Sequence, residues 1–252
     1  MGYLHEGHAA LLRRARAESD VVVASVFVNP TQFGAGEDFT TYPRDVPRDL
    51  ALLAREAVDV AFVPPPRGFY PPGAATSVVV GAVAEPLEGA ARPGHFRGVA
   101  TVVTMLFNAV SPARAYFGDK DWQQLQVIKR LVRDLHLPVS IVGVPTVREG
   151  DGLALSSRNV RLSAADRAKA TILFRALAAA RRAYAAGERS PAKLERALAT
   201  ELAKEPDAVI EYAVVVDGAS LQPIVEANAG SRALIAARVG GVRLIDNGAL
   251  TD

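Results

Sequence analysis

Short apolar runs alternate along the chain with stretches in which apolar residues recur every three or four positions. The run at 21–28 is apolar and mostly β-branched, which predicts a strand covered on both faces. A helical pattern follows at 46–56, with Leu50 and Leu53 on one face, and a second apolar run occupies 58–63. Strand, helix and strand in this order are typical of a parallel βαβ unit.

The same alternation continues to about residue 146. It predicts further strands at 76–83, 114–117 and 139–144, and helices at 99–110 and 121–136. Alternation over this length favours an α/β fold, in which a parallel sheet is wound with right-handed crossovers and carries helices on both faces.

Beyond this point the order of the elements changes. A glycine-rich turn precedes a long Ala-rich helical region at 164–186, a second helix at 191–204, and strands at 209–216 and 233–245. Helices followed by strands are typical of an α+β domain. We therefore predict two domains, at 1–146 and 147–252.

The composition is that of an ordinary globular protein, and it excludes several classes of function. Of the 252 residues 50% are hydrophobic, and the formal net charge is only +2, which favours neither a nucleic-acid partner nor another polyanion. The absence of cysteine excludes disulfides, thiolate metal sites and a cysteine nucleophile. The apolar runs are too short to cross a bilayer and no leader precedes the first motif, so we expect a cytoplasmic protein without a membrane partner.

Two histidines flank a glycine where the chain enters its first predicted helix. The first turn of a helix leaves backbone N–H groups unpaired and carries the positive end of the helix dipole, so it stabilises an anion. His5 and His8 add side-chain donors, and Gly7 allows a ligand close to the backbone. The pattern indicates a phosphate site, although two histidines at this spacing also occur at an ordinary helix start or in a metal site.

Asn29 and Gln32 lie directly after the strand at 21–28. In an open parallel sheet the carboxyl ends of the strands form the edge at which ligands bind. A turn whose Asn, Pro and Gly suit loop geometry explains this segment equally well, except for Gln32. Gln124, one turn into a later helix, is predicted to face the same pocket as Gln32.

A second polar turn follows the strand at 114–117. Gly118 gives access to the backbone, and Lys120 offers a mobile ammonium group in a chain whose 29 basic residues include only five lysines. The alternative is a helix cap, in which Asp119 or Asp121 accepts from the first amides. The two interpretations are compatible.

A third polar segment lies at the predicted domain junction. Ser156, Ser157 and Arg158 follow a glycine turn and would supply three groups to a polyphosphate if the loop closed. Considered alone, this segment is better explained as a capped turn before the next helix. Taken together, the three segments favour a nucleotide pocket.

These segments, in this order, resemble the pantothenate synthetases (pantoate–β-alanine ligases) of the nucleotidyltransferase superfamily with HIGH and KMSKS motifs. The matching motifs are HEGH at 5–8, NPTQF at 29–33, GDKDWQQ at 118–124 and SSRN at 156–159, and the match covers nearly the whole chain. The resemblance implies a Rossmann-like first domain that binds ATP and pantoate, and a C-terminal α+β lid. It further implies an ATP- and Mg²⁺-dependent ligase that forms pantothenate through pantoyl adenylate, releases pyrophosphate and AMP, and acts as a cytoplasmic homodimer.

The resemblance also assigns roles to residues at the matching positions. It places along ATP Met1, Gly2, Tyr3, Leu4, His5, Glu6, Gly7, His8, Gly118, Asp119, Lys120, Asp121, Val147, Leu155, Ser156, Ser157 and Arg158. The implied catalytic set is His5, His8, Lys120, Ser156, Ser157 and Arg158, with His8 as the proton donor. Gln32 and Gln124 are assigned to pantoate, and Gln32 also to β-alanine, with Asn29, Tyr42 and Arg92 as further candidates. The magnesium ligands stay unassigned, with Asp49 and Asp121 as candidates.

Two features depart from the family pattern. Leu155 stands where the family usually has methionine, a volume-conserving change that we expect to be harmless. Members also carry a further segment before the HxGH helix, including the first strand of the sheet. A parallel sheet that lacks a central strand leaves backbone groups unpaired, so we expect an upstream-extended chain to be the active one.

Two other functions remain open on the sequence. One is an adenylyltransferase of the same superfamily, and the other is a catalytically impaired nucleotide-binding form. A ligase releases pyrophosphate only with pantoate and AMP only with β-alanine, whereas an adenylyltransferase transfers AMP to a phosphorylated acceptor.

Overall fold

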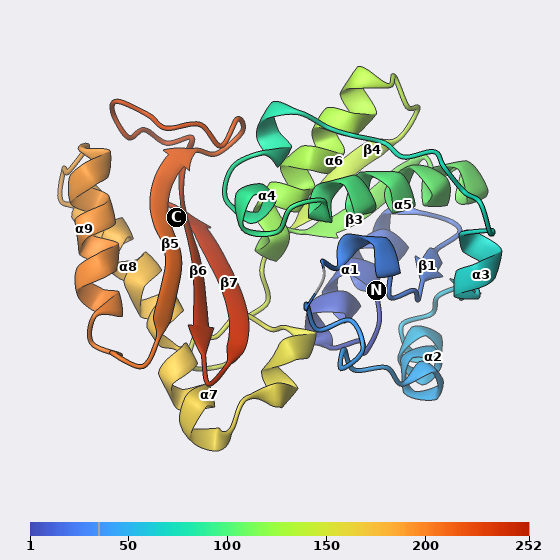
Figure 1. The fold of residues 1–252 in the computed structure, drawn as a ribbon, viewed down its shortest axis with the longest axis horizontal. Helices are drawn as coiled ribbons and strands as arrows, with labels where there is room; N and C mark the ends of the chain where they lie inside the picture. Colours follow the sequence, from blue (N-terminus) through green and yellow to red (C-terminus); the bar gives the residue numbers. More distant parts are fainter. Residues whose placement is uncertain (35, 252) are drawn as a thin grey trace. The chain divides into compact units, whose positions relative to one another are not determined.

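The computed structural model describes residues 1–34 and 36–251, drawn as a ribbon in Figure 1. Contacts divide the chain into two units. Unit 1 contains Met1–Asp119 and Gln123–Pro145, and unit 2 contains Lys120–Trp122 and the chain from Thr146 onward. The chain therefore joins unit 2 briefly at Lys120–Trp122 before it returns to unit 1.

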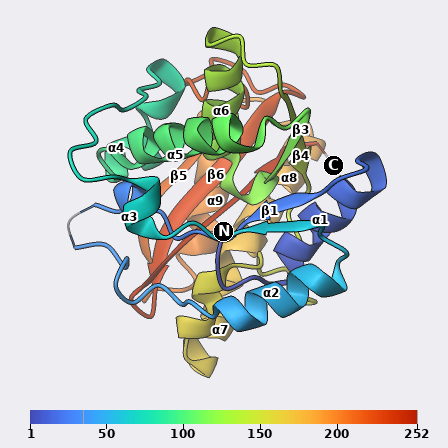
Figure 2. The ribbon, with the colours of Figure 1, turned by 90° about the vertical axis from the view of Figure 1, so that its right-hand side faces the viewer.

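Unit 1 combines parallel strands with helices. Its described strands are β1 (Val23–Ser25), β2 (Val60–Phe62), β3 (Arg114–Gly118) and β4 (Ser140–Val144). Its helices are α1 (Glu6–Glu18), α2 (Val46–Arg55), α3 (Pro66–Phe69), α4 (Glu88–Ala91), α5 (His95–Val110) and α6 (Trp122–Asp134), with 3₁₀ turns η1 (Pro30–Gln32), η2 (Ala82–Ala84) and η3 (Asp119–Asp121). Within the described residues β1 pairs in parallel with β2, and β3 with β4, as two separate two-stranded sheets. Helix α1 packs against β3 and β4 (Figure 2).

The parallel strands and flanking helices confirm the predicted α/β class, but the predicted strand at 76–83 is wrong. The N–H of Val78 donates to the hydroxyl of Thr101 at 2.9 Å, and Ala82–Ala84 forms a 3₁₀ turn. Val79 is 73% exposed. The β-branched run therefore lies along the surface, where its backbone pairs with a helix side chain instead of a neighbouring strand.

A buried cluster joins the opening segment to the first strand of unit 1. Leu4 is fully buried and packs with Leu12 of α1, with Ala24 and Val26 at β1, and with Leu53 of α2. The N–H of Phe27 also donates to the carbonyl of Met1 at 2.8 Å. The segment that enters α1 is thus held beside the carboxyl end of β1.

Unit 2 packs helices against an antiparallel sheet. Its elements are η4 (Ser157–Arg161), α7 (Ala164–Ala170), α8 (Ile172–Ala185), α9 (Pro191–Leu202), β5 (Val209–Asp217), β6 (Ser231–Val239) and β7 (Val242–Ala249). The strands lie in the order β5-β6-β7, and α8 and α9 pack against each other and against the sheet (Figure 1). The helix expected at 164–186 is divided at Thr171, whose N–H and hydroxyl both donate to the carbonyl of Ala168. The α+β character of this part is confirmed.

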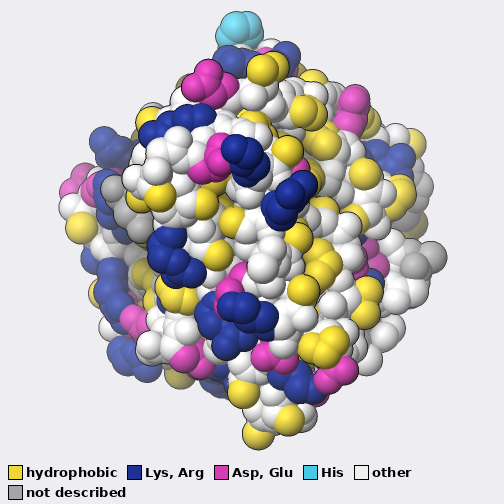
Figure 3. Space-filling view, turned by 90° about the vertical axis from the view of Figure 1, so that its left-hand side faces the viewer, with side chains coloured by type: hydrophobic (Ala, Val, Ile, Leu, Met, Phe, Trp, Pro, Cys, Tyr) yellow, Lys and Arg dark blue, Asp and Glu magenta, His cyan; other side chains and the backbone are white. Residues whose placement is uncertain are grey.

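Acidic and basic side chains are interspersed on the face that Figure 3 shows, with hydrophobic side chains between them. Among the described residues, none of the helices has the length and apolar composition that crossing a bilayer requires.

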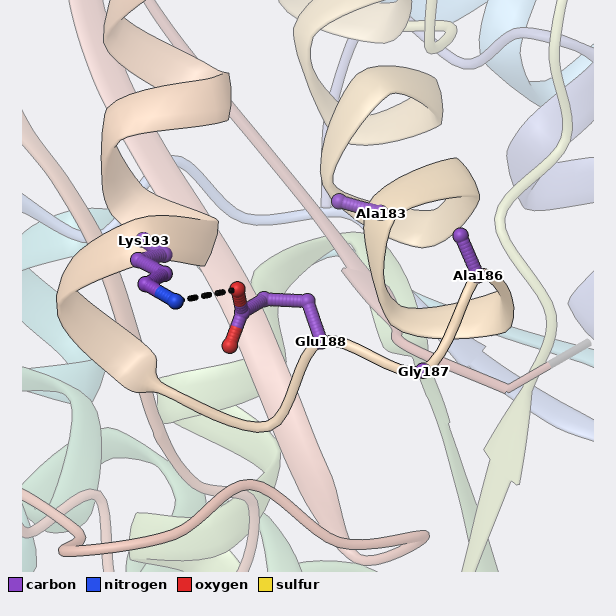
Figure 4. A pocket seen from close by; sticks show the side chains of 5 residues that line it. All are labelled: Ala183, Ala186, Gly187, Glu188 and Lys193. Atoms are coloured by element: carbon purple, nitrogen blue, oxygen red, sulfur yellow. Dashed lines mark ion pairs between the residues drawn. The ribbon is translucent and has the colours of Figure 1, made fainter.

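A surface hollow lies where α8 ends. It is lined by Ala183, Ala186, Gly187, Glu188 and Lys193 (Figure 4). The ammonium of Lys193 lies 3.2 Å from the carboxylate of Glu188. The hollow contains none of the site residues predicted from the sequence.

Candidate active site

The start of α1 is closed by its two histidines. His5 is the N-cap residue, and its Nδ1 accepts from the N–H of Gly7 at 3.2 Å. The Nδ1 of His8 accepts from the N–H of His5 at 3.2 Å, and the ring centroids lie 4.1 Å apart. The predicted helix start is confirmed, but two of the amides there already bind imidazole nitrogens.

These hydrogen bonds fix the tautomers of both histidines. A backbone N–H can only donate, so Nδ1 of His5 and of His8 is an unprotonated acceptor and the proton of each ring lies on Nε2. The helix start therefore combines neutral imidazoles that donate through Nε2–H with the positive end of a helix dipole. This arrangement is suited to binding a phosphate without a protein nucleophile.

A buried carboxylate holds the segment before α1. Asp49 is 1% exposed, and its two oxygens accept from the N–H groups of Tyr3 at 2.8 Å and Leu4 at 2.6 Å. Tyr3 has a φ of 52°, which non-glycine residues rarely adopt, and the guanidinium of Arg48 lies 4.5 Å from its ring centroid. Both oxygens of this magnesium candidate are thus used to hold backbone, so the carboxylate does not fit a metal ligand.

Asn29 is buried at the end of β1 and organises the loop that carries Gln32. Its Oδ1 accepts from the hydroxyls of Thr31 and Tyr70, both at 2.9 Å. Its Nδ2 donates to the carbonyl of Gly98 at 3.1 Å and to Oε1 of Gln32 at 3.3 Å. A Cβ on Gly98 would lie 2.2 Å from the carbonyl oxygen of Thr31, so α5 approaches this loop closely only through glycine. Asn29 therefore supports the Gln32 side chain.

A second network holds the backbone of Gln32. The Nδ1 of His95 lies 2.8 Å from the carbonyl oxygen of Gln32, and its Nε2 lies 3.2 Å from Nη1 of Arg92. Because a carbonyl only accepts and a guanidinium only donates, His95 is neutral with its proton on Nδ1. Burial, followed by the adjacent Arg92 guanidinium, lowers the pKa of His95 to about 4. Arg92 also donates two hydrogen bonds to Glu37, at 2.9 and 2.6 Å, so its guanidinium is bound to a carboxylate of the protein.

The neutral His95 makes stability depend on pH. Its folded pKa lies below the value of about 6.5 expected for the unfolded chain, so only the unfolded chain takes up this proton between pH 6.5 and about 4. The His95 contribution is therefore fully present above pH 6.5 and is lost as the pH falls. From pH 6.5 to 5 we expect the free energy of unfolding to fall by about 2 kcal/mol on this account.

Urea denaturation between pH 7 and pH 5 measures this slope. His95→Asn removes the titrating group and should flatten the slope, whereas the same change at the exposed His136 should leave it unaltered. Equal slopes in the parent chain and in His95→Asn would show that other groups cause the acid sensitivity.

The turn after β3 separates two glutamines with different surroundings. A Cβ on Gly118 would meet no atom within 4 Å, so space is open beside the strand end. Gln123 is buried, accepts from the N–H of Glu88 at 3.0 Å and donates to the carbonyl of Pro86 at 2.7 Å. Gln124, the predicted pantoate contact, makes no side-chain hydrogen bond within the described residues.

In unit 2 the predicted lid segment forms a hairpin and a capped turn. The N–H of Leu155 donates to the carbonyl of Val147 at 3.0 Å, so these two predicted ATP contacts are paired with each other. Ser156 is the N-cap of η4, and its hydroxyl accepts from the N–H of Arg158 at 3.3 Å. Ser157 is buried. The alternative interpretation of this segment, a capped turn, is therefore confirmed.

Each unit carries one part of the predicted site. Unit 1 brings together the segment before α1 and the loop of Gln32, both at the end of β1. Tyr42 lies near this loop and packs edge-on against Phe33, with ring centroids 5.8 Å apart. Unit 2 contains Lys120, whose Nζ lies 3.8 Å from Oδ1 of Asp121, together with Ser156–Arg158. Within the described residues no cluster of three or more His, Asp or Glu side chains has the arrangement of a metal site.

The family described as pantoate-beta-alanine ligase matches this chain over residues 1–249. The chain belongs to this family. It is 56% identical to the pantothenate synthetase of Roseiflexus sp. (strain RS-1), over 98% of this chain and 89% of that protein. The pantothenate synthetase of Deinococcus radiodurans is also 56% identical, over 98% of this chain and 90% of that protein.

Two solved pantoate–β-alanine ligases have the same fold. The enzyme from Thermus thermophilus is 53% identical and superposes with a TM-score of 0.97 over 100% of this chain and 91% of its own. The enzyme from Francisella tularensis, crystallised with β-γ ATP and β-alanine, is 36% identical, with a TM-score of 0.82 over 99% of this chain and 87% of its own. The predicted family, fold class and enzyme class, an ATP-dependent pantoate–β-alanine ligase, are confirmed.

Sequence reasoning missed three residues that shape this site. They are Tyr70, His95 and Gly98, which surround the loop of Gln32. The contact of His95 with Arg92 is not a helical spacing that the sequence could reveal, because Arg92 closes α4, Gly94 has a φ of 84°, and His95 begins α5. The other two act through contacts between segments that are distant in sequence.

Proposed function

We propose that this pantoate–β-alanine ligase makes pantothenate in two steps, and that His5, His8, Lys120 and Ser156–Arg158 act on ATP. In the first step a carboxylate oxygen of pantoate attacks the α-phosphorus of ATP, the bond to the β-phosphate oxygen breaks, and pyrophosphate leaves. In the second step the amine of β-alanine attacks the acyl carbon of pantoyl adenylate, loses a proton, and AMP leaves. The observation that carries the proposal is the His5–His8 pair, neutral and protonated on Nε2 at the start of α1.

The first step needs positioning and positive charge more than it needs a covalent catalyst. Displacement at phosphorus develops charge on the phosphate oxygens, which Nε2–H donors and the Lys120 ammonium stabilise. His8, through Nε2–H, is the proposed proton donor to the departing oxygen. Gln32 and Gln124 hold pantoate, Gln32 also lies near β-alanine, and Asn29 keeps Gln32 in place.

The second step requires protection from water, because an acyl adenylate hydrolyses readily. We assign this task to the C-terminal unit at 147–252, acting as a lid that carries Ser156–Arg158 over the nucleotide held by the domain at 1–146. Val147 and Leu155, paired across the hairpin, are the apolar ATP contacts of this lid. Tyr42 and Arg92 serve as supporting residues near the acid-binding loop.

Magnesium enters as part of the nucleotide substrate, since Mg²⁺ is usually held by one or two carboxylates together with substrate phosphates. Asp121 fits this role, because its side chain is 49% exposed and lies beside Lys120. We further propose that the enzyme acts as a homodimer in the cytoplasm, in line with its family resemblance.

A coupled assay of the two products tests the proposal. Pyrophosphate release should require pantoate, and AMP release should require β-alanine as well. Transfer of AMP to a phosphorylated acceptor would favour an adenylyltransferase. Tight ATP binding without pantoate-dependent exchange of pyrophosphate into ATP would indicate a catalytically impaired nucleotide-binding form.

A further inference from the structure

The segment that carries Lys120 is attached to unit 2 by a set of side chains that the reaction itself does not use. Trp122, the single tryptophan of the chain, donates through Nε1 to the carbonyl of Gly218 at 2.6 Å. The guanidinium of Arg232 lies over the same indole, 3.5 Å from the ring centroid. A stacked cation and a short hydrogen bond fix the indole from two directions.

Asn247 on β7 completes this attachment. Its side-chain oxygen accepts from Nε of Arg232 at 2.6 Å, and its Nδ2 donates to the carbonyl oxygen of Lys120 at 2.8 Å. Asn247 is 4% exposed, so a lost hydrogen bond there is not replaced by water. The side-chain amide of Asn247 therefore links the backbone of Lys120 to Arg232, which stacks on Trp122.

The neighbouring Asp246 ties the same strand to the lid hairpin. Its carboxylate accepts from Nη1 and Nη2 of Arg148 at 2.7 and 2.9 Å and from the N–H of Asn247 at 2.8 Å. Arg148 forms a β-bridge with Ala154, and β7 also contacts η4, which begins at Ser157. Strand β7 is thus the common support of Lys120 and of the serine turn.

We propose that Asn247 is a positioning residue which, together with Arg232 and Trp122, holds Lys120 in register with Ser156–Arg158. The inference rests on the proposed function, because it assigns Lys120 to ATP. Its consequence is that the predicted phosphate ligands of the lysine turn and of the lid belong to one rigid part of the molecule.

The test combines Asn247→Asp with Lys120→Met in a double-mutant cycle. Asn247→Asp keeps an acceptor for Arg232 and replaces the donor to the Lys120 carbonyl with a carboxylate oxygen, which can only accept. We expect it to slow pantoate-dependent exchange of pyrophosphate into ATP by about tenfold, the effect of one buried hydrogen bond. In the Lys120→Met background the same change should have almost no further effect, because the group that it positions is already absent.

Asn228→Asp is the matched control. Asn228 lies in the turn before β6, and its Oδ1 accepts from the N–H of Gly230 at 2.8 Å, so aspartate preserves its contact. The exchange rate should stay at the parent value. If the two losses of rate multiply in the double variant, the proposal is wrong. Such a result would mean that Asn247→Asp damages the protein in a way that does not act through Lys120.

Trp122 fluorescence tests the attachment without any activity. Asn247→Asp should make the indole more accessible to acrylamide, and Asn228→Asp should not. If Asn247→Asp fails to fold, Arg232→Lys, which loses the Nε donor, takes its place in both measurements. Absence of exchange activity from the parent chain, and also from the same chain extended upstream, would refute the proposed function, whereas unchanged quenching in the folded variant would refute the attachment.

Discussion

Replacing Lys120 with methionine is expected to slow pantoate-dependent pyrophosphate release by about 10²–10³-fold, the size typical of losing one group that stabilises transition-state charge. Methionine keeps much of the aliphatic stem and removes the ammonium. The carboxylate of Asp121, at 3.8 Å from Nζ, is half exposed, so the pair contributes little to the fold. Activity and stability should therefore separate in this variant.

The measurement is the single-turnover rate of pyrophosphate release, combined with thermal unfolding of the same samples. Lys193→Met is a suitable control, because Lys193 also pairs with a carboxylate, Glu188, at 3.2 Å, but in the hollow at the end of α8. It should leave the rate unchanged. A Lys120→Met enzyme that keeps the parent rate would remove Lys120 from the catalytic set and would leave the His5–His8 pair as the main phosphate site.

Most of the fold was predictable because its elements carry strong periodic signals. The stripe on α6, with Leu125, Ile128 and Leu131 buried, and the apolar run of β4 each specify their own structure locally. The run at 76–83 has the same composition as a strand, yet Val78 pairs with Thr101 of α5. Composition alone does not reveal whether a neighbouring strand is present, because pairing is a property of distant segments.

The candidate site shows the same division between local and distant information. His5 and His8 were recognisable, since a helix cap and its partner lie three residues apart. Asp49 is a magnesium candidate on the sequence, but its oxygens accept from the amides of Tyr3 and Leu4, which approach from 46 and 45 positions away in the sequence. Asn247 gave no sequence signal, because its partners come from η3 and β6. Motifs therefore identify the groups that touch substrate, whereas the groups that position them are found only in three dimensions.

Replacing Asp49 with alanine is expected to damage both the fold and ATP binding. The amides of Tyr3 and Leu4 would lose their buried acceptor, and the free energy of unfolding should fall by about 3 kcal/mol or more, as for two hydrogen bonds to a charged group. Since the carboxylate binds the N–H of Tyr3, whose φ of 52° is unfavourable, we expect the chain before α1 to relax in this variant and to displace His5. We expect the KM for ATP to rise about tenfold and the KM for β-alanine to change little.

Asp45→Ala provides the comparison that separates the two effects. Asp45 caps the same helix, α2, and its Oδ1 accepts from the N–H of Arg48 at 3.0 Å, so its loss should reduce stability by about 1 kcal/mol. Within the described residues, Asp45 makes no hydrogen bond to the segment before α1. The KM for ATP should therefore stay constant in Asp45→Ala. If Asp49→Ala lowered stability but left the KM for ATP at the parent value, the strained conformation of Tyr3 would be irrelevant to the nucleotide. If the KM rises only in Asp49→Ala, this buried carboxylate is part of the machinery that shapes the phosphate site.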